Sequence, residues 1–441
     1  MYLPDYVEKI IDTLESAGFE AYAVGGCVRD YLMGITPDDY DVTTSANPDT
    51  VKLLFEKTYD TGIEHGTVTV LMDGVPVEVT TFRCEEAYID NRKPSSVSFV
   101  KNLEEDLKRR DFTINALAYN KRRGIVDLFG GNGDIKKGEI KCVGNPEERF
   151  EEDALRMLRA IRFACKTGFN LTDDTKTAIL KKAPLIKNVS KERIKAELEK
   201  AITSKHREKL YLFYELGISK QIAPWLDFCM KTPQNTQYHM YNVGTHMLKA
   251  LEYAKPDKDV CWAALLHDVG KPYKRITDKN GVDHFKGHEE ISAQIADEIM
   301  RELKFDNRSR LRIKKVIALH RFEYEHSPYG IKKAICHCGR ENFDLLLSLM
   351  EADSKAHSQN TALDRLKTLD LIKEIYESVK DDPITLKELK INGNDLKALG
   401  YCGGEIGIVL ERLLDNVLKD KNLNEKNKLL QLAGNKNVLE I

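Results

Sequence analysis

Two aspartates near the N-terminus are spaced so that both can bind one metal ion. Asp39 and Asp41 lie in the segment 39–44, which is rich in residues that favour β-strands. Because successive side chains of a strand alternate between its faces, the two carboxylates point the same way, about 7 Å apart along the backbone. Mg²⁺ prefers one or two carboxylates together with substrate phosphates. The pair therefore predicts a Mg²⁺ site, although many Asp-x-Asp pairs are only solvated acidic turns.

The residues just before this pair have the properties of a phosphate-binding turn. Gly25 and Gly26 follow an apolar run, Ala21–Val24, that is typical of a strand. Glycines let backbone N–H groups approach an anion, and Arg29 follows at a spacing from which it can hold a phosphate. Together with the aspartate pair, this turn predicts a metal-dependent site for a nucleoside triphosphate.

A third carboxylate can join this site. Val75, Val77 and Val79 alternate with polar residues, and Glu78 is one of these. If the valines are buried, Glu78 points to the opposite face, toward the same cleft as the aspartates. Three carboxylates on neighbouring strands can hold two metal ions, one activating a hydroxyl and one steadying a leaving pyrophosphate.

Two further stretches combine acidic and basic side chains at helical spacing. On one helix, four residues spaced three apart form a polar ridge beside an apolar one: Asp153, Arg156, Arg159 and Arg162. Spacing alone favours a solvated face with ion pairs. The segment Arg109–Asp111 likewise fits an ion pair on a helix surface, worth under about 1 kcal/mol.

Histidines are concentrated in the second half of the chain, where nine of the eleven lie between His239 and His357. A mixture of imidazole and carboxylate side chains suits Mn²⁺, Fe, Ni²⁺ or Mg²⁺. The candidate side chains in this segment, in chain order, are His246, His267 with Asp268, His288, His320 and Asp353. Lys271 is placed to steady a phosphate.

These motifs, in this order, resemble the class II tRNA nucleotidyltransferases, which are the bacterial CCA-adding enzymes and their poly(A) polymerase relatives. The resemblance is strong over the N-terminal half and moderate over the C-terminal tail. It rests on Gly-Gly-x-Val-Arg-Asp at 25–30, the Asp-x-Asp pair, Arg-Arg-Asp-Phe-Thr at 109–113 and Glu-Asp-x-x-Arg at 152–156. The histidine-rich segment resembles the HD phosphohydrolase superfamily. That resemblance implies His246, His267, Asp268 and Asp353 as metal ligands, with His288 and His320 able to complete a second metal position.

The resemblance implies an enzyme that adds CCA to the 3′ end of tRNA, without a template, from CTP and ATP. Asp39 and Asp41 would bind Mg²⁺, with Glu78 assisting activation of the tRNA 3′-hydroxyl. The nucleotide-binding residues that it implies are Gly26 and Arg29 at the phosphates, Arg110 at the triphosphate, Asp111 at the ribose hydroxyls, and Asp153 and Arg156 at the base, with Arg159 and Arg162 on the same ridge.

Alternatives stay open. The polar stretch 90–96 fits an ordinary surface loop, whereas in the family a flexible loop here is shortened in enzymes that add only the two cytidines. Its full length favours an enzyme that can incorporate adenosine, but an adenosine-only enzyme and a poly(A) polymerase share the same motifs. From a different class, the chain could act mainly as an HD metal phosphohydrolase on RNA ends or nucleotides. An HD domain could also be purely structural.

Composition limits the class of protein. The chain has 441 residues, 42% of them hydrophobic and 31% charged, which predicts several globular domains. We expect a cytoplasmic protein, since there is no membrane-length apolar run, no signal-peptide pattern and no Cys-x-x-Cys pair among nine cysteines. The net charge of −2 means that RNA must be attracted locally, for example by the basic stretch Lys181–Leu210.

Short elements must position the N-terminal motifs. We expect a helix over Asp5–Gly18, a short helix over Asp30–Met33, a helix over Asn47–Phe55 and a hairpin over Glu64–Phe82. The predicted fold class is α+β: a nucleotidyltransferase α/β head followed by all-α regions. The predicted domains are a catalytic head (1–145), a helical neck and body that binds nucleotide and tRNA (146–232), an HD domain (233–360) and a helical tail (361–441).

Overall fold

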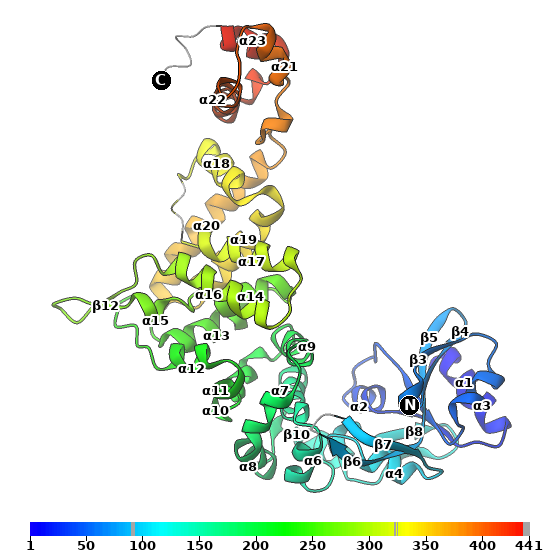
Figure 1. The fold of residues 1–441 in the computed structure, drawn as a ribbon. Helices are drawn as coiled ribbons and strands as arrows, with labels where there is room; N and C mark the ends of the chain where they lie inside the picture. The colour runs from blue at the N-terminus through cyan, green and yellow to red at the C-terminus, as the bar shows by residue number, and fades with distance from the viewer. Residues whose placement is uncertain (90–92, 322, 324, 435–441) are drawn as a thin grey trace. The chain divides into compact units, whose positions relative to one another are not determined.

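The computed structural model describes residues 1–89, 93–321, 323 and 325–434. The chain divides into two compact units, residues 1–227 and 228–441. Most strands lie in the N-terminal part of the first unit, and helices make up most of the rest (Figure 1). The α+β class is therefore confirmed. The helical regions also contain two short sheets: β10 (Glu139–Ile140) with β11 (Asn170–Leu171), and β12 (Ile276–Thr277) with β13 (Asp283–His284).

A seven-stranded sheet forms the scaffold of the head. Its order is β3-β4-β5-β2-β1-β8-β9, and neighbouring strands are antiparallel except β2 with β5. The neighbouring strands β2, β1 and β8 are almost entirely buried. The strands are β1 (Ala21–Val24), β2 (Asp41–Thr44), β3 (Thr58–Gly62), β4 (Thr67–Met72), β5 (Val75–Thr81), β8 (Leu117–Asn120) and β9 (Gly124–Asp127).

Several local predictions are confirmed. Helix α1 (Asp5–Ser16) buries its expected apolar stripe: Val7, Ile10, Ile11 and Leu14. Helix α3 (Pro48–Leu54) begins after Asn47, whose side chain caps the helix by accepting the N–H of Thr50. The hairpin of β4 and β5 turns at Asp73 and Gly74, both with positive φ.

Two predictions near the aspartate pair are wrong. Helix α2 (Gly26–Leu32) begins directly after the glycine turn rather than at Asp30, because Gly25, with a φ of 74°, turns the chain straight from β1 into the helix. Strand β2 begins at Asp41. Asp39 therefore lies before the strand, and strand alternation does not relate the two carboxylates.

The polar ridge is also not on one helix. Helix α6 (Pro146–Glu152) ends before Asp153, which is extended with φ −138° and ψ 103°. Its side chain accepts the N–H of Leu155, the first residue of α7 (Leu155–Thr167), at 3.1 Å. The three arginines of the ridge lie on α7. The acidic side chain precedes that helix.

The polar stretch between the motifs is a hairpin rather than a loop. Strands β6 (Arg83–Ile89) and β7 (Lys93–Phe99) pair antiparallel. Residues 90–92, part of the predicted flexible segment 90–96, lie outside the described residues. The polar composition of this stretch gave no sequence signal for these strands.

The remaining helices complete both units. In the first unit they are α4 (Leu103–Lys108), α5 (Gly131–Lys137), α8 (Asp173–Lys182), α9 (Lys191–Ile202), α10 (Leu212–Glu215) and α11 (Ser219–Ile222), and α12 (Pro224–Met230) crosses the boundary. In the second unit they are α13 (Val243–Tyr253), α14 (Lys258–Leu266), α15 (Lys271–Lys274), α16 (His288–Glu302), α17 (Asn307–Leu319), α18 (Pro328–Cys338), α19 (Arg340–Lys355), α20 (Gln359–Val379), α21 (Gly393–Ala398), α22 (Glu405–Lys419) and α23 (Lys426–Gly434).

The tail has an apolar core of its own, built around Leu396, Leu413 and Leu429.

Helices in the described ranges are all too short or too polar to cross a membrane.

A pair of glycines in α5 tests how tightly the head packs. A Cβ on Gly131 would overlap the carbonyl oxygen of Thr113, whereas a Cβ on Gly133 would meet nothing within 4 Å. We expect Gly131→Ala to lower stability by about 1–3 kcal/mol through overpacking. Gly133→Ala should be neutral or slightly stabilising, because alanine favours the helix. Urea midpoints of the two variants measure this difference, and equal midpoints would contradict the packing.

Candidate functional site

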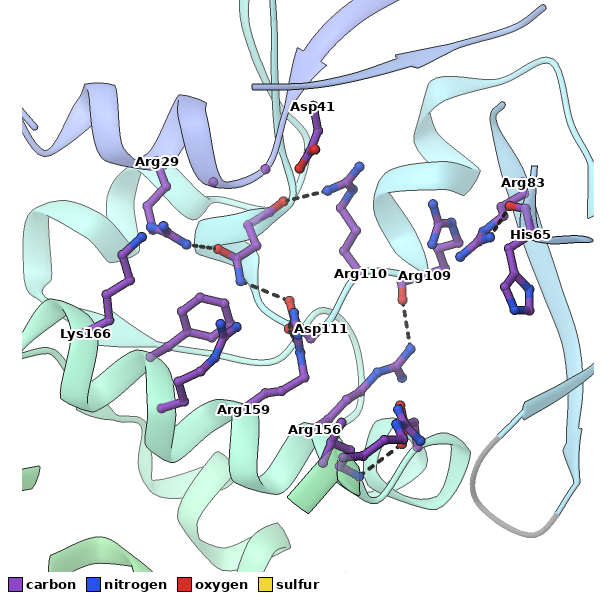
Figure 2. Close-up of a pocket in the computed structure, with 18 residues that line it drawn as sticks. Arg29, Asp41, His65, Arg83, Arg109, Arg110, Asp111, Arg156, Arg159 and Lys166 are labelled. Carbon is purple, nitrogen blue, oxygen red and sulfur yellow. Dashed lines mark hydrogen bonds and ion pairs between the residues drawn. The ribbon is translucent and has the colours of Figure 1, made fainter. Parts of the chain in front are cut away.

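A cavity of about 720 Å³ lies in the first unit and brings most of the predicted N-terminal site residues together (Figure 2). Its walls come from the β1–α2 turn, the start of β2, the segment after α4, and α7. The lining is strongly basic, with nine cationic side chains against three aspartates: Arg29, Arg83, Arg109, Arg110, Arg156, Arg159, Arg162, Lys166 and Arg193 against Asp41, Asp111 and Asp153. Such an excess of positive charge attracts a polyanion.

The carboxylates at one edge of the cavity are crowded. Asp41 is directly opposite Glu78 in the parallel pair β2–β5, so the two side chains share a face of the sheet. Loss of solvent and the negative charges of Glu78 and Asp39 raise the pKa of Asp41 to about 6, although Arg110 opposes the shift. Like charges that disfavour ionisation in this way fit a position for a cation.

The glycine turn makes room for an arginine. A Cβ on Gly25 would lie 2.9 Å from Nη1 of Arg110, so any side chain there would displace the guanidinium. The same Nη1 donates to the main-chain oxygen of Asn115 at 3.4 Å. Gly26, the first residue of α2, also lines the cavity. The turn thus lets Arg110 lie against the backbone that precedes α2.

Arg29 lines the cavity but is 2% exposed. Its Nε donates to Oδ1 of Asp30 at 2.8 Å, and Nη2 lies 2.7 Å from the same oxygen. Nζ of Lys166, on α7, lies 3.1 Å from the other oxygen of Asp30. One carboxylate therefore holds two cations at the same end of the cavity, and Lys166 is a lining residue that the sequence did not indicate.

An ion pair of Arg109 and Arg110 with Asp111, the purely structural interpretation of this motif, is not formed among the contacts of the described residues. Both arginines pair instead with Asp106, a fully buried residue of α4. Arg109 donates from Nε and Nη2 to Oδ1 at 2.9 and 2.7 Å, and Nη2 of Arg110 lies 3.4 Å from Oδ2. Asp106 lies three and four residues before these arginines, which is the helical spacing that could have identified it.

Asp111 instead forms an ion pair with Arg159 of α7. Nε and Nη2 of Arg159 lie 2.8 and 2.7 Å from its Oδ2, and the Asn115 amide and the Phe112 N–H donate to Oδ1. Burial favours the neutral acid, but Arg159 and these hydrogen bonds outweigh it and lower the pKa of Asp111 to about 2. Asp111 is therefore an ionised hydrogen-bond acceptor at neutral pH.

Helix α9 supplies partners for the other end of the cavity. Nη2 of Arg193 lies 2.7 Å from Oδ2 of Asp153, and Oε2 of Glu197 lies 2.8 Å from Nε of Arg162. Arg156 pairs with Glu152 and donates to the main-chain oxygen of Arg109 at 3.0 Å. All four predicted ridge residues thus line the cavity, although they do not share one helix. Arg193 and Glu197 were missed because only the packing of α9 on α7 brings them here.

A second group of chemically active side chains lies in the second unit, around Asp268. Its Oδ1 lies 3.0 Å from Nε2 of His288 and 3.7 Å from Nε2 of His320. Its Oδ2 lies 3.2 Å from Nε2 of His267 and 3.5 Å from Nε2 of His246. One carboxylate therefore faces two pairs of histidines.

Asp353 closes one side of this cluster. Its Oδ1 lies 2.9 Å from Nε2 of His246 and 3.4 Å from Nε2 of His267. Its Oδ2 accepts a hydrogen bond from Nη2 of Arg365, on α20, at 2.6 Å. The six predicted ligands thus lie together. Across the part of the chain that the structure describes, the sets of three potential ligand atoms within 4.8 Å of one another all belong to this region.

The cluster fits a divalent metal. His267, His288 and His320 each place Nδ1 within 2.7–2.8 Å of the carbonyl oxygen three residues earlier, which fixes Nδ1 as the donor and leaves Nε2 facing inward. Nζ of Lys271 lies 2.7 Å from Oδ2 of Asp268. The three Nε2 atoms are buried without a hydrogen bond among the described residues. Buried polar atoms are rarely left so, and the imidazole–carboxylate set suits a transition metal.

Three family models match successive parts of the chain. The poly A polymerase head domain matches residues 21–141, the probable RNA and SrmB-binding site of polymerase A matches 168–230, and the HD domain matches 236–382. The first model covers the sheet and Asp41, and the third covers the Asp268 cluster. Both domain types imply use of a divalent metal ion.

Similar proteins cover the chain to different extents. A CCA-adding enzyme of Lactobacillus helveticus (strain DPC 4571) is 52% identical over 224 residues, which are 50% of this chain and 56% of that relative. In such matches the chain spans about half the length of the relative. A CCA-adding enzyme of Streptococcus pyogenes serotype M5 (strain Manfredo) is 35% identical over 423 residues, which are 94% of this chain and 93% of the relative.

A solved structure has a similar fold over nearly the full length of the chain. The Bacillus stearothermophilus CCA-adding enzyme in complex with CTP has a TM-score of 0.75 and 30% identity, covering 99% of this chain and 98% of that chain. Since the streptococcal relative matches along nearly its whole length, the fold and the sequence agree, and this chain belongs to the CCA-adding enzyme family.

Proposed function

We propose that this chain adds CCA to the 3′ end of tRNA, one nucleotide at a time and without a template, from CTP and ATP, and releases pyrophosphate. The observation that carries the proposal is the basic cavity with the crowded carboxylate Asp41 at its edge. The name of the streptococcal relative supports CCA addition over an adenosine-only or poly(A) activity. A tRNA substrate also supports a cytoplasmic location.

Different residues of the cavity would bind different parts of the nucleotide. Arg110 and Arg29, beside the Gly25–Gly26 turn, would bind the triphosphate and then the leaving pyrophosphate. Asp111, which is ionised at neutral pH, would accept a hydrogen bond from a ribose hydroxyl, and a 2′-hydroxyl distinguishes a ribonucleotide. These contacts orient the α-phosphate toward the tRNA 3′-hydroxyl.

The base would be read by side chains. Asp153 accepts from an exocyclic amino group, and Arg156 donates to a carbonyl oxygen and a ring nitrogen, which together match a cytosine edge. A small rearrangement of the same pair serves adenine. In the described structure Arg193 pairs with Asp153, and Glu152 pairs with Arg156, so both reading groups are held in place before a nucleotide arrives. Arg159 and Arg162 would support them from α7.

Asp39 and Asp41 would hold Mg²⁺, and Glu78 would assist activation of the 3′-hydroxyl. Carboxylate oxygens are the ligands that Mg²⁺ prefers, and the raised pKa of Asp41 is the sign of an uncompensated negative position. When bound, the ion supplies positive charge to the phosphate under attack and to the leaving pyrophosphate.

Substitution of Asp41 tests the function. Wild-type protein is given tRNA transcripts that end at the discriminator base, at C or at CC, with Mg²⁺ and CTP, ATP or both. We expect completion of all three to CCA, followed by arrest. Asp41→Asn should lose addition of both nucleotides by roughly 10³-fold or more, because metal charge stabilisation is worth several kcal/mol.

The same variant should fold normally. In EDTA, Asp41→Asn should unfold at the wild-type temperature or above it, since the substitution relieves repulsion from Glu78 and Asp39. Asp12→Asn, on the exposed side of α1, is the matched control and should retain full activity. Transfer activity retained by Asp41→Asn would refute the assignment of the site. Extension of only the CC transcript, or unlimited addition of A, would replace CCA addition with one of the alternatives.

A second variant tests base reading. Asp153→Ala should still transfer nucleotides, but its preference for CTP over UTP should fall roughly 10- to 100-fold, because a hydrogen bond to a charged group is worth about 1.5–3 kcal/mol. The ratio of kcat/KM values on a transcript ending at the discriminator base measures this. Asp173→Ala, whose side chain is 97% exposed on α8, should keep the wild-type ratio. An unchanged ratio in Asp153→Ala would remove its role in selection.

We also propose a second activity, metal-dependent phosphoester hydrolysis at the Asp268 cluster. The buried Nε2 atoms without hydrogen bonds support it. A cavity of about 880 Å³ beside the cluster, lined by His239, Lys271 and His288, gives a substrate access. His246, His267, Asp268 and Asp353 would hold one metal ion, and His288 and His320 would share Asp268 with another. When bound, such an ion activates a water for attack on a phosphate.

Metal content tests this centre independently of transfer activity. Protein incubated with Ni²⁺ or Mn²⁺ and then desalted should retain metal, and Asp268→Ala should lose it entirely because both groups share that carboxylate. His288→Ala should lose only part. His284→Ala, which alters an exposed histidine paired with Asp278, should retain the wild-type content. Equal metal content in Asp268→Ala and wild type would exclude the proposed centre.

A further inference from the structure

Asn115 connects two charged residues that have different proposed tasks. Its Oδ1 accepts a hydrogen bond from Nη1 of Arg29 at 2.5 Å. Its Nδ2 donates to Oδ1 of Asp111 at 3.1 Å. The residue is 6% exposed and lines the cavity, where it contacts both Arg29 and Asp111.

An amide is the side chain that this position requires. A guanidinium only donates and an ionised carboxylate only accepts, so the residue between them must accept on one side and donate on the other. Aspartate would satisfy Arg29 but would repel Asp111. Leucine, of similar size, would leave both hydrogen bonds unmade.

The backbone of Asn115 takes part as well. Its carbonyl oxygen accepts from Nη1 of Arg110, the second arginine proposed to bind the triphosphate. The short 3₁₀ helix Thr113–Asn115 is anchored by a 2.6 Å hydrogen bond from Oγ1 of Thr113 to Oδ2 of Asp134, in α5. The backbone that carries the amide is therefore tied to α5 and to Arg110.

Arg29 and Asp111 each have another charged partner, so neither depends on Asn115 to stay in position. Arg29 keeps its ion pair with Asp30, and Asp111 keeps Arg159. Removal of the amide would thus leave two intact ion pairs that are no longer tied to each other. This separates a positioning role from a purely structural one.

We propose that Asn115 is a positioning residue that ties the triphosphate-binding arginines to the ribose-reading Asp111, so that ribose selection and triphosphate binding depend on each other. The inference rests on the proposed nucleotidyltransferase function. A nucleotide whose ribose hydroxyl donates a hydrogen bond to Asp111 then has its triphosphate aligned with Arg29 and Arg110. A deoxynucleotide loses both the hydroxyl contact and part of this alignment.

The test measures binding, so that it does not depend on turnover. Affinities for CTP, dCTP and inorganic tripolyphosphate are determined by calorimetry for wild type, Asn115→Leu and Asn115→Asp. In Asn115→Leu, we expect the CTP-to-dCTP affinity ratio to approach one and tripolyphosphate affinity to fall roughly tenfold or more, as expected for lost hydrogen bonds to charged groups. Asn115→Asp should lose the ratio as well, because it repels Asp111.

Other outcomes would overturn the inference. A structural role alone predicts equal losses for CTP and dCTP with the wild-type ratio preserved. Unchanged tripolyphosphate affinity in Asn115→Leu would confine the residue to the ribose. Urea midpoints identify a variant that fails to fold. If Asn115→Leu does not fold, the affinities of Asn115→Asp, which keeps the side-chain volume, decide between the two roles. If wild-type protein itself fails to bind CTP or to extend tRNA, the proposed function fails; if it succeeds while the ratio survives in both variants, only this inference fails.

Discussion

The basic cavity of the head depends on buried carboxylates that hold its arginines in place. Guanidinium groups so close together repel one another, and a buried charge is tolerated only when it is paired. Asp106 binds Arg109 and Arg110, and Glu197 lies near Arg159 and Arg162. Such pairs fix the direction of each guanidinium, so that the cavity is preorganised for an anion before any nucleotide binds.

An aromatic ring complements these carboxylates. Three guanidinium carbons, those of Arg29, Arg159 and Arg162, lie 5.2, 5.5 and 4.2 Å from the ring centroid of Phe163. The ring face attracts cations and cannot form a competing ion pair. Phe163 also packs edge-on against Phe112, which follows Asp111 directly. Hydrophobic packing of α7 against the head thus sets the positions of charged groups that come from different elements.

The sequence predicted which residues belong to this site better than it predicted the contacts that these residues make. Motif order identified Asp41, Asp111 and the arginines of α7, and apolar periodicity predicted α1 and the β4–β5 hairpin, because these signals are local. The break at Asp153 could not be foreseen, because Asp153 keeps the three-residue spacing of the arginines that follow it although its backbone is extended. The Arg193 and Glu197 contacts depend on the packing of α9 on α7, which no local spacing encodes. The histidine cluster was predictable because imidazoles and carboxylates in that order have few structural uses.

We infer that the basic cavity of the head binds the nucleotide and that its side chains read the base. A crystal structure of the protein with Mg²⁺ and a CTP analogue that cannot release pyrophosphate tests this claim most directly. We predict the triphosphate against Arg29 and Arg110, a ribose hydroxyl on Asp111, and the cytosine edge on Asp153 and Arg156. A nucleotide bound elsewhere, or one with its base facing solvent, would contradict the account.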